Sequence, residues 1–143
     1  MTHTTSQQYA AALRAALETP DASHRLQAAL SAGTRPDPEF IDVLVARCAV
    51  EPDFFVRDML TWALVRQDRT PTLEALLPQL ASDVAQARSQ ALHTLSKIAD
   101  PAIWGAITPA LIGDADDEVA AAAWRTAAAL VPPGREAALA AAL

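Results

Sequence analysis

The chain has 143 residues, of which 52% are hydrophobic and 20% are charged, and its formal net charge is −6, from 11 basic and 17 acidic residues. This apolar composition excludes a disordered chain, and the length fits a single domain. The acidic balance opposes neutralisation of a phosphate backbone, so it disfavours nucleic acid as a partner.

Capping residues that stand directly before a proline mark four expected helix starts: Thr19-Pro20, Asp37-Pro38, Thr70-Pro71 and Asp100-Pro101. Proline is tolerated in the first helical turn because its missing N–H would have no partner there. Apolar residues recur at three- and four-residue spacing between these marks, and no segment alternates like a strand. In chain order the pattern predicts helices at about 5–18, 20–32, 38–49, 53–67, 71–81, 84–98, 101–112, 116–130 and 134–143.

The chain also repeats itself at an offset of 31 or 32 residues. Two of the recurring positions are an apolar one, at Leu13, Leu44, Leu76 and Ile107, and an arginine, at Arg25, Arg57 and Arg88. Each unit holds two helices, an A helix followed by a B helix. We therefore predict one all-α domain over 1–143, with repeats at approximately 5–33, 37–67, 70–98 and 101–130 and a half-repeat at 134–143.

These units resemble HEAT repeats. Residues 111–119, LIGDADDEV, are similar to the family's A-helix end, acidic turn and B-helix start. Glu51 with Arg57, and Asp83 with Arg88, stand at the family's acidic-turn and B-helix arginine positions. The resemblance implies an α-α superhelix of about four HEAT-like helical hairpins plus a C-terminal half-repeat. It also implies a ladder of acid–arginine pairs, although Ala120 replaces the arginine in the last full unit and the first unit has no clear acidic turn.

In stacked helical hairpins the B helices line the concave face, where a partner can bind. A rotation of 100° per residue identifies the B-helix residues that are expected to point away from the core. The candidates for partner binding are Asp58, Thr61, Trp62, Leu92, His93, Trp124 and Arg125. Three of them are large and apolar, and such a stripe on a surface indicates an interface. The alternative is that each indole packs into the neighbouring hairpin and that the charged residues are solvated.

Motifs for catalysis and for metal binding are absent from the sequence. A chain with four glycines has no GxSxG motif, no P-loop and no glycine-rich dinucleotide turn. His3, His24 and His93 lack metal-ligand spacing, and the single Cys48 fits a small core residue. The sequence therefore predicts no catalytic residue, no metal and no cofactor.

Taken together, these observations predict a non-catalytic protein-protein interaction scaffold that binds a protein or peptide on its concave B-helix face. The alternative is a HEAT-like DNA-binding or alkylpurine DNA glycosylase-type repair protein, because Asp58, Trp62 and Trp124 could imitate the acidic and aromatic residues of such a groove. Few basic residues would line that groove, which argues against the alternative.

The two ends of the chain bear on its location and on its self-association. No apolar run is long enough to span a bilayer and the first residues lack a secretory signal, so we expect no membrane partner and a cytoplasmic location. The expected last helix has an A-type position without a B partner. Ala138, Leu139 and Leu143 cannot all face one neighbour, which predicts either a homodimer through the C-terminal end or fraying of this helix. The alternatives are that the end stacks on another protein or that the natural protein continues beyond it.

Overall fold

The computed structural model describes residues 2–141, and every regular element in that range is a helix. The A helices are α1 (Thr2–Leu17), α3 (Phe40–Cys48), α5 (Arg69–Leu76), which continues as the 3-10 helix η1 (Leu77–Ala81), and α7 (Pro109–Ile112), which the 3-10 helix η2 (Pro101–Ala106) precedes. The B helices are α2 (Ala22–Thr34), α4 (Phe54–Val65), α6 (Ala85–Ile98) and α8 (Asp117–Leu130), and α9 (Glu136–Ala141) follows. The all-α prediction is confirmed.

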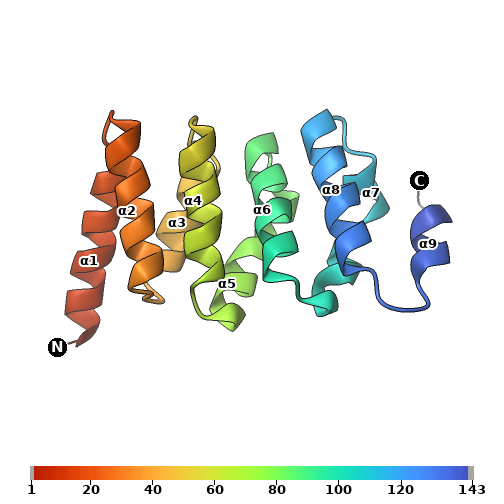
Figure 1. The fold of residues 1–143 in the computed structure, drawn as a ribbon, viewed down its shortest axis with the longest axis horizontal. Helices are drawn as coiled ribbons and strands as arrows, with labels where there is room; N and C mark the ends of the chain where they lie inside the picture. Colours follow the sequence, from red (N-terminus) through yellow and green to blue (C-terminus); the bar gives the residue numbers. More distant parts are fainter. Residues whose placement is uncertain (1, 142–143) are drawn as a thin grey trace.

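The helices stack along one axis with the two termini at opposite ends (Figure 1). The B helices form one row in the order α2, α4, α6 and α8, and the A helices lie behind them (Figure 1). Helix α2 packs along α4, and α6 packs along α8. This arrangement confirms the predicted α-α superhelix of four hairpins and a half-repeat.

Aspartates cap three of the four B helices. The side chain of Asp53 accepts a hydrogen bond from the Val56 amide at 3.0 Å, and the carboxylates of Asp21 and Asp116 do the same at the starts of α2 and α8. Helix α2 therefore begins two residues after Pro20, because Asp21 rather than Thr19 is the cap. Asp100 does cap the element that follows it, since it accepts from the Ala102 amide at 3.0 Å.

Two predicted A helices are interrupted at prolines. The predicted helix at 71–81 is split into α5 and η1 next to Pro78, and the one at 101–112 is split into η2 and α7 before Pro109. Proline cannot donate the backbone hydrogen bond that a continuous α-helix needs at these positions. Thr108 begins the second segment by accepting a hydrogen bond from the Leu111 amide at 3.3 Å.

Buried polar side chains join neighbouring B helices across the apolar core. The hydroxyls of Thr61 on α4 and Thr94 on α6 lie 2.8 Å apart, and both residues are buried. The hydroxyl of Thr126 on α8 donates to the Leu92 carbonyl on α6 at 3.0 Å, and the Gln67 amide that follows α4 donates to the Ala32 carbonyl on α2 at 3.0 Å. Because a buried polar group is costly without a partner, these bonds fix how the hairpins stack.

None of the described helices combines the length and the apolar composition that a membrane span requires.

Candidate functional site

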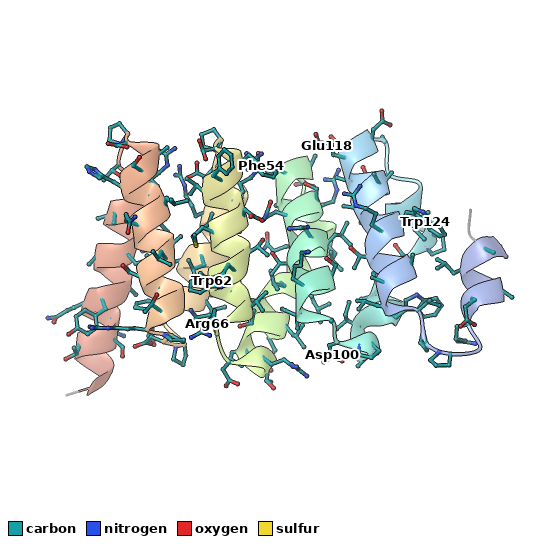
Figure 2. All side chains as sticks on the ribbon, in the orientation of Figure 1. Phe54, Trp62, Arg66, Asp100, Glu118 and Trp124 are labelled. Atoms are coloured by element: carbon teal, nitrogen blue, oxygen red, sulfur yellow. The ribbon has the colours of Figure 1, made fainter. Side chains whose placement is uncertain are left out.

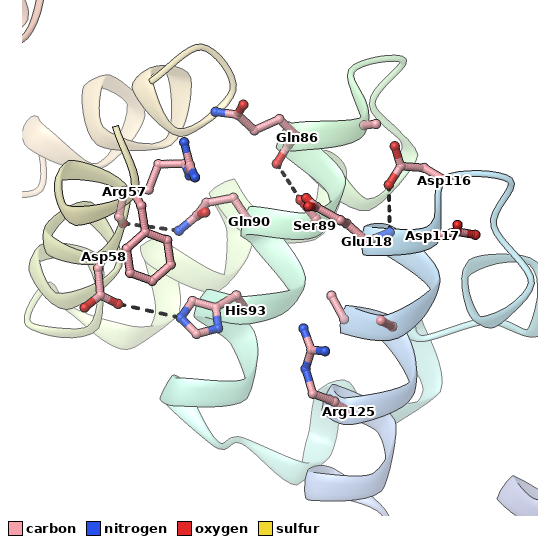
Figure 3. Close-up of a pocket in the computed structure, with 14 residues that line it drawn as sticks. Arg57, Asp58, Gln86, Ser89, Gln90, His93, Asp116, Asp117, Glu118 and Arg125 are labelled. Atoms are coloured by element: carbon pink, nitrogen blue, oxygen red, sulfur yellow. Dashed lines mark hydrogen bonds and ion pairs between the residues drawn. The ribbon is translucent and has the colours of Figure 1, made fainter. Parts of the chain in front are cut away.

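A groove of about 720 Å³ lies over three B helices (Figure 3). The wall on α4 holds Phe54, Arg57 and Asp58. The middle of the groove is formed by α6, and the opposite wall by α8 with its N-cap. Their polar lining residues are Gln86, Ser89, Gln90, His93, Asp116, Asp117, Glu118 and Arg125. The repeat places these residues together because the B helices lie side by side (Figure 1).

The two walls differ in charge. The α4 wall carries one cation, Arg57, and one anion, Asp58, whereas Asp117 and Glu118 add two anions at the first turn of α8. The helix dipole stabilises carboxylates at that first turn, so their position there follows from local sequence. Arg125 lies two turns further along α8 and is directed into the groove (Figure 3). The groove therefore offers groups of both signs to a ligand.

His93 lies at the middle of the groove and faces Asp58, with 3.9 Å between the imidazole Nε2 and a carboxylate oxygen (Figure 3). Burial lowers the pKa of His93 below its ordinary value, and the charges of Lys97 and Arg125 lower it further, while Asp58 opposes them. The imidazole is therefore neutral at pH 7 and can both donate and accept a hydrogen bond.

Outside the groove, ion pairs connect successive repeats near the starts of the B helices. Arg25 donates to both carboxylate oxygens of Glu51, at 2.8 and 3.1 Å, and Arg47 donates to Glu51 at 3.1 Å. Burial alone would raise the pKa of Glu51, but the hydrogen bonds from Arg25, the Asp53 amide and Arg47 hold it below its ordinary value. The hydrogen bond with Glu51 in turn raises the pKa of Arg25.

A second such pair joins Arg88 to Asp114, again through two hydrogen bonds, each of 3.1 Å. The hydrogen bonds from the Asp116 amide and from Arg88 lower the pKa of Asp114. Arg25 and Arg88 therefore each pair with the acid of the following repeat. The resemblance suggested interruptions at the two ends of the ladder, yet the pairs in the structure are the first and the third.

The interruption is at Arg57, in the middle of the ladder. Its Nη1 donates to the carbonyls of Glu51 and Pro52 at 3.0 and 2.8 Å, but within the described residues it makes no ion pair. The turn position held by Glu51 and Asp114, three residues before a B helix, is held in this repeat by Ser82. The prediction that Asp83 holds that position is wrong by one residue, because the side chain that binds the amide two residues ahead is that of Ser82.

The structure brings three of the seven predicted site residues into the groove, namely Asp58, His93 and Arg125. Two others are corrected: Thr61 is buried between α4 and α6 in the hydrogen bond with Thr94, and Leu92 is fully buried in the core. Both face the next hairpin rather than the open face. The predicted apolar stripe is therefore incomplete, because a helical wheel does not include the neighbouring repeat.

The remaining two candidates, Trp62 and Trp124, do not line the groove. Trp62 packs on Gly33 of α2, and the guanidinium of Arg66 lies 5.5 Å from the centre of its ring. Trp124 stands on the side of α8 that faces the C-terminal end of the stack (Figure 2). The set of Asp58 with two indoles, which the DNA-repair alternative required, is not assembled in one place.

Sequence reasoning did not select several groove residues, although the sequence carried a signal for Phe54 and for Arg57. Phe54 and Phe55 begin α4 where the other B helices carry small or polar residues, and their side chains are 64% and 71% exposed. Arg57 is recognisable from the repeat offset, but its missing partner is visible only in the structure. Gln86 and Gln90 carry no sequence signal, because polar residues on a B helix are ordinary.

A second hollow, of about 540 Å³, lies between α1, α2 and α3. Tyr9, Leu13 and Phe40 line it together with small residues, and Arg35 lies at its edge. Among the described residues no group of histidine, cysteine, aspartate and glutamate side chains is placed to hold a metal ion.

Comparison with known proteins gives one family. Residues 1–65 match the model of HEAT repeats, which confirms the resemblance that the internal repeat indicated. No curated protein matches the chain. HEAT repeats generally mediate protein-protein interactions and are typically non-catalytic.

Proposed function

We propose that the chain, which is a HEAT-like repeat protein, binds a segment of another protein in the groove over α4, α6 and α8, and so acts as a non-catalytic scaffold. The observation that carries the proposal is the groove itself, a volume of about 720 Å³ on the row of B helices. Its size suits a few residues of an extended or helical segment.

Exposed aromatic side chains at the groove edge support this proposal. Phe54 lines the groove, and the ring of Phe55 packs edge to face on the ring of Phe54 with 5.6 Å between the ring centres. Exposed aromatic rings are costly in water and frequent in protein interfaces, where their burial supplies much of the binding energy. They give the groove an apolar anchor beside its polar floor.

The distribution of charge favours a protein segment over nucleic acid. A phosphate backbone would face Asp116, Asp117 and Glu118 on the α8 wall, and the net charge of −6 repels polyanions. A protein segment can present both acidic and basic side chains, which matches a groove with groups of both signs.

A displayed library of random peptides tests the proposal directly. The wild-type chain and a Tyr9→Ala control, which removes an equally exposed aromatic ring outside the groove, should enrich the same peptides. A Phe54→Ala/Arg125→Ala variant should bind those peptides at least about tenfold more weakly. Peptides that bind this variant and the wild type equally would contradict a binding site in the groove.

A further inference from the structure

We infer that the groove recognises a carboxylate of its protein partner at Arg57, so that an aspartate or glutamate side chain of the partner completes the interrupted acid–arginine ladder. This inference rests on the proposed function and specifies the chemistry of the partner. It follows from a comparison of three arginines that occupy equivalent positions in three repeats.

Arg25, Arg57 and Arg88 use the same atoms in the same way toward their own repeat. In each case Nη1 donates to a carbonyl six residues earlier, at 2.9, 3.0 and 2.8 Å respectively. These hydrogen bonds hold each guanidinium at the start of its B helix. The three side chains are therefore positioned alike, and differ in what the remaining nitrogens meet.

The Nε and Nη2 atoms of Arg25 donate two hydrogen bonds to the carboxylate of Glu51 in the next repeat, and those of Arg88 do the same to Asp114. This fork is the arrangement for which a guanidinium is best suited. For Arg57 the corresponding place is held by Ser82, whose hydroxyl accepts a hydrogen bond from the Val84 amide. Asp83, one residue further on, is exposed, and the hydrogen bonds that the described residues show for the Arg57 guanidinium go to the carbonyls of Glu51 and Pro52 rather than to Asp83.

The guanidinium of Arg57 also differs in its surroundings. Of the three ladder arginines, only Arg57 is among the residues that line the groove, next to Phe54 and Gln86. A carboxylate carried by a bound segment can therefore reach the nitrogens that an internal acid occupies in the neighbouring repeats. Figure 3 shows Arg57 on the α4 side of the groove, across from the acidic start of α8.

The opposite wall adds a second condition on the partner. Because the chain carries a net charge of −6, a uniformly acidic segment would be repelled at long range. A segment with one acid toward Arg57 and a lysine or arginine toward Asp117 and Glu118 complements both walls. The occupant is thus a protein segment of mixed charge with an essential carboxylate.

Two blocked pentapeptides provide the test: glycine-aspartate-glycine-lysine-glycine and its asparagine counterpart. Each is titrated into the full chain while the side-chain Nε–H signals of the arginines are followed by NMR, with Arg57→Lys used to assign the Arg57 signal. The aspartate peptide should shift the Arg57 Nε–H signal in a saturable way. At equal peptide concentration, this chemical-shift change should be at least about fivefold larger than the change caused by the asparagine peptide. The signals of Arg25 and Arg88 should stay in place, since their forks are occupied.

A Ser82→Asp variant then supplies the missing acid internally, with Ser82→Asn as the uncharged control that keeps the amide acceptor. Ser82→Asp should reduce the Arg57 response to the aspartate peptide at least about fivefold, and Ser82→Asn should not. If Ser82→Asp does not fold, Arg57→Gln serves instead, read from the backbone amide of Gln86. An absent response, equal responses to both peptides, or an unchanged response in the folded Ser82→Asp or Arg57→Gln variant would each overturn the inference.

Failure here is distinguishable from failure of the proposed function. Suppose that binding of the library peptides depends on Phe54 and Arg125 but persists when every acidic residue of the peptide is replaced by its amide. The groove would then remain a binding site, and the role of Arg57 would be overturned. Library peptides that bind the Phe54→Ala/Arg125→Ala variant as well as the wild type would contradict the proposed function. The pentapeptide titration would still decide whether Arg57 binds a carboxylate.

Discussion

Gly33 on α2 lies directly against the indole of Trp62 on α4, so that a side chain at position 33 would have no room. A Cβ built on Gly33 would approach Cε3 of Trp62 to 2.7 Å and the backbone Cα of Ala63 to 2.9 Å. The close contact between the first two B helices therefore depends on a glycine in the last turn of α2, at a position where any side chain would meet α4.

The first prediction concerns this contact. Gly33→Ala should destabilise the chain by about 1–3 kcal/mol, because the backbone of α4 as well as the ring must move away. Urea denaturation followed by circular dichroism measures the change. Gly105→Ala is the control, since an added Cβ there meets no other atom, and it should change stability by less than about 0.5 kcal/mol. Equal stability of the two variants would show that α2 and α4 do not pack this closely.

The second prediction concerns the buried hydroxyls between α4 and α6. Thr61→Val should cost about 1–3 kcal/mol of unfolding free energy, because Thr94 and the Gln90 amide, which donates to Thr61 at 2.7 Å, both lose a buried partner. Thr70→Val, at an exposed position, is the matched control. A Thr61→Val variant as stable as this control would place Thr61 on the surface, where the helical wheel put it.

The third prediction follows the buried carboxylate of Glu51 through pH. Its pKa is lower in the folded chain than the ordinary 4.5, so the unfolded state binds the proton more readily. The stability that this group contributes is complete above about pH 4.5 and is lost as the pH falls toward the folded pKa. Glu51→Gln should cost about 3 kcal/mol at pH 7 and flatten the stability curve below pH 4.5. Parallel curves for the two proteins would contradict this assignment.

The fourth prediction concerns the protonation of His93 in the groove. Since burial and the Lys97 charge lower its pKa while Asp58 raises it, Lys97→Met should raise the pKa and Asp58→Asn should lower it. Proton NMR of the imidazole Cε1–H over pH 4–8 reads both shifts. If both substitutions leave the titration of His93 unchanged, the imidazole does not face these two side chains.

The fifth prediction concerns self-association, which we propose to run through the C-terminal end of the stack. Trp124 stands one repeat beyond Leu92 and two beyond Thr61, at the position that faces the next B helix, and no B helix follows α8 within the described residues. Its side chain is 36% exposed, whereas that of Leu139 is buried and Leu143 lies outside the described residues. Light scattering should show that the average molar mass rises with protein concentration, and that this rise is smaller for the Trp124→Ala variant. A constant monomer mass would end the proposal.

The sequence predicted the architecture well because architecture depends on patterns that repeat. The offset of 31 or 32 residues and the helical spacing of apolar residues located the hairpins, and the proline breaks at Pro78 and Pro109 changed only the regularity of two A helices. Helix ends were less certain where two capping residues compete, as Thr19 and Asp21 do before α2.

The site was predicted only in part, for a physical reason. A helical wheel separates the face toward the partner A helix from the rest, but it cannot tell the open face from the sides that contact the neighbouring B helices. Thr61 and Leu92 lie on such sides, and the same ambiguity concealed how Trp62 packs on Gly33. The ladder is interrupted at Arg57 because Ser82, and not Asp83, holds the turn position before α6. A repeat offset that varies between 31 and 32 residues cannot distinguish these two neighbouring positions.

The most direct test of the central claim is a map of amide chemical-shift changes when a library-selected peptide binds the ¹⁵N-labelled chain. If the groove over α4, α6 and α8 is the binding site, the largest changes will fall on its lining, at Phe54, Arg57, Gln86, His93 and Arg125, and residues of the hollow between α1, α2 and α3 will stay unchanged. Largest changes around Tyr9, Leu13 and Phe40, with none in the groove, would contradict the account.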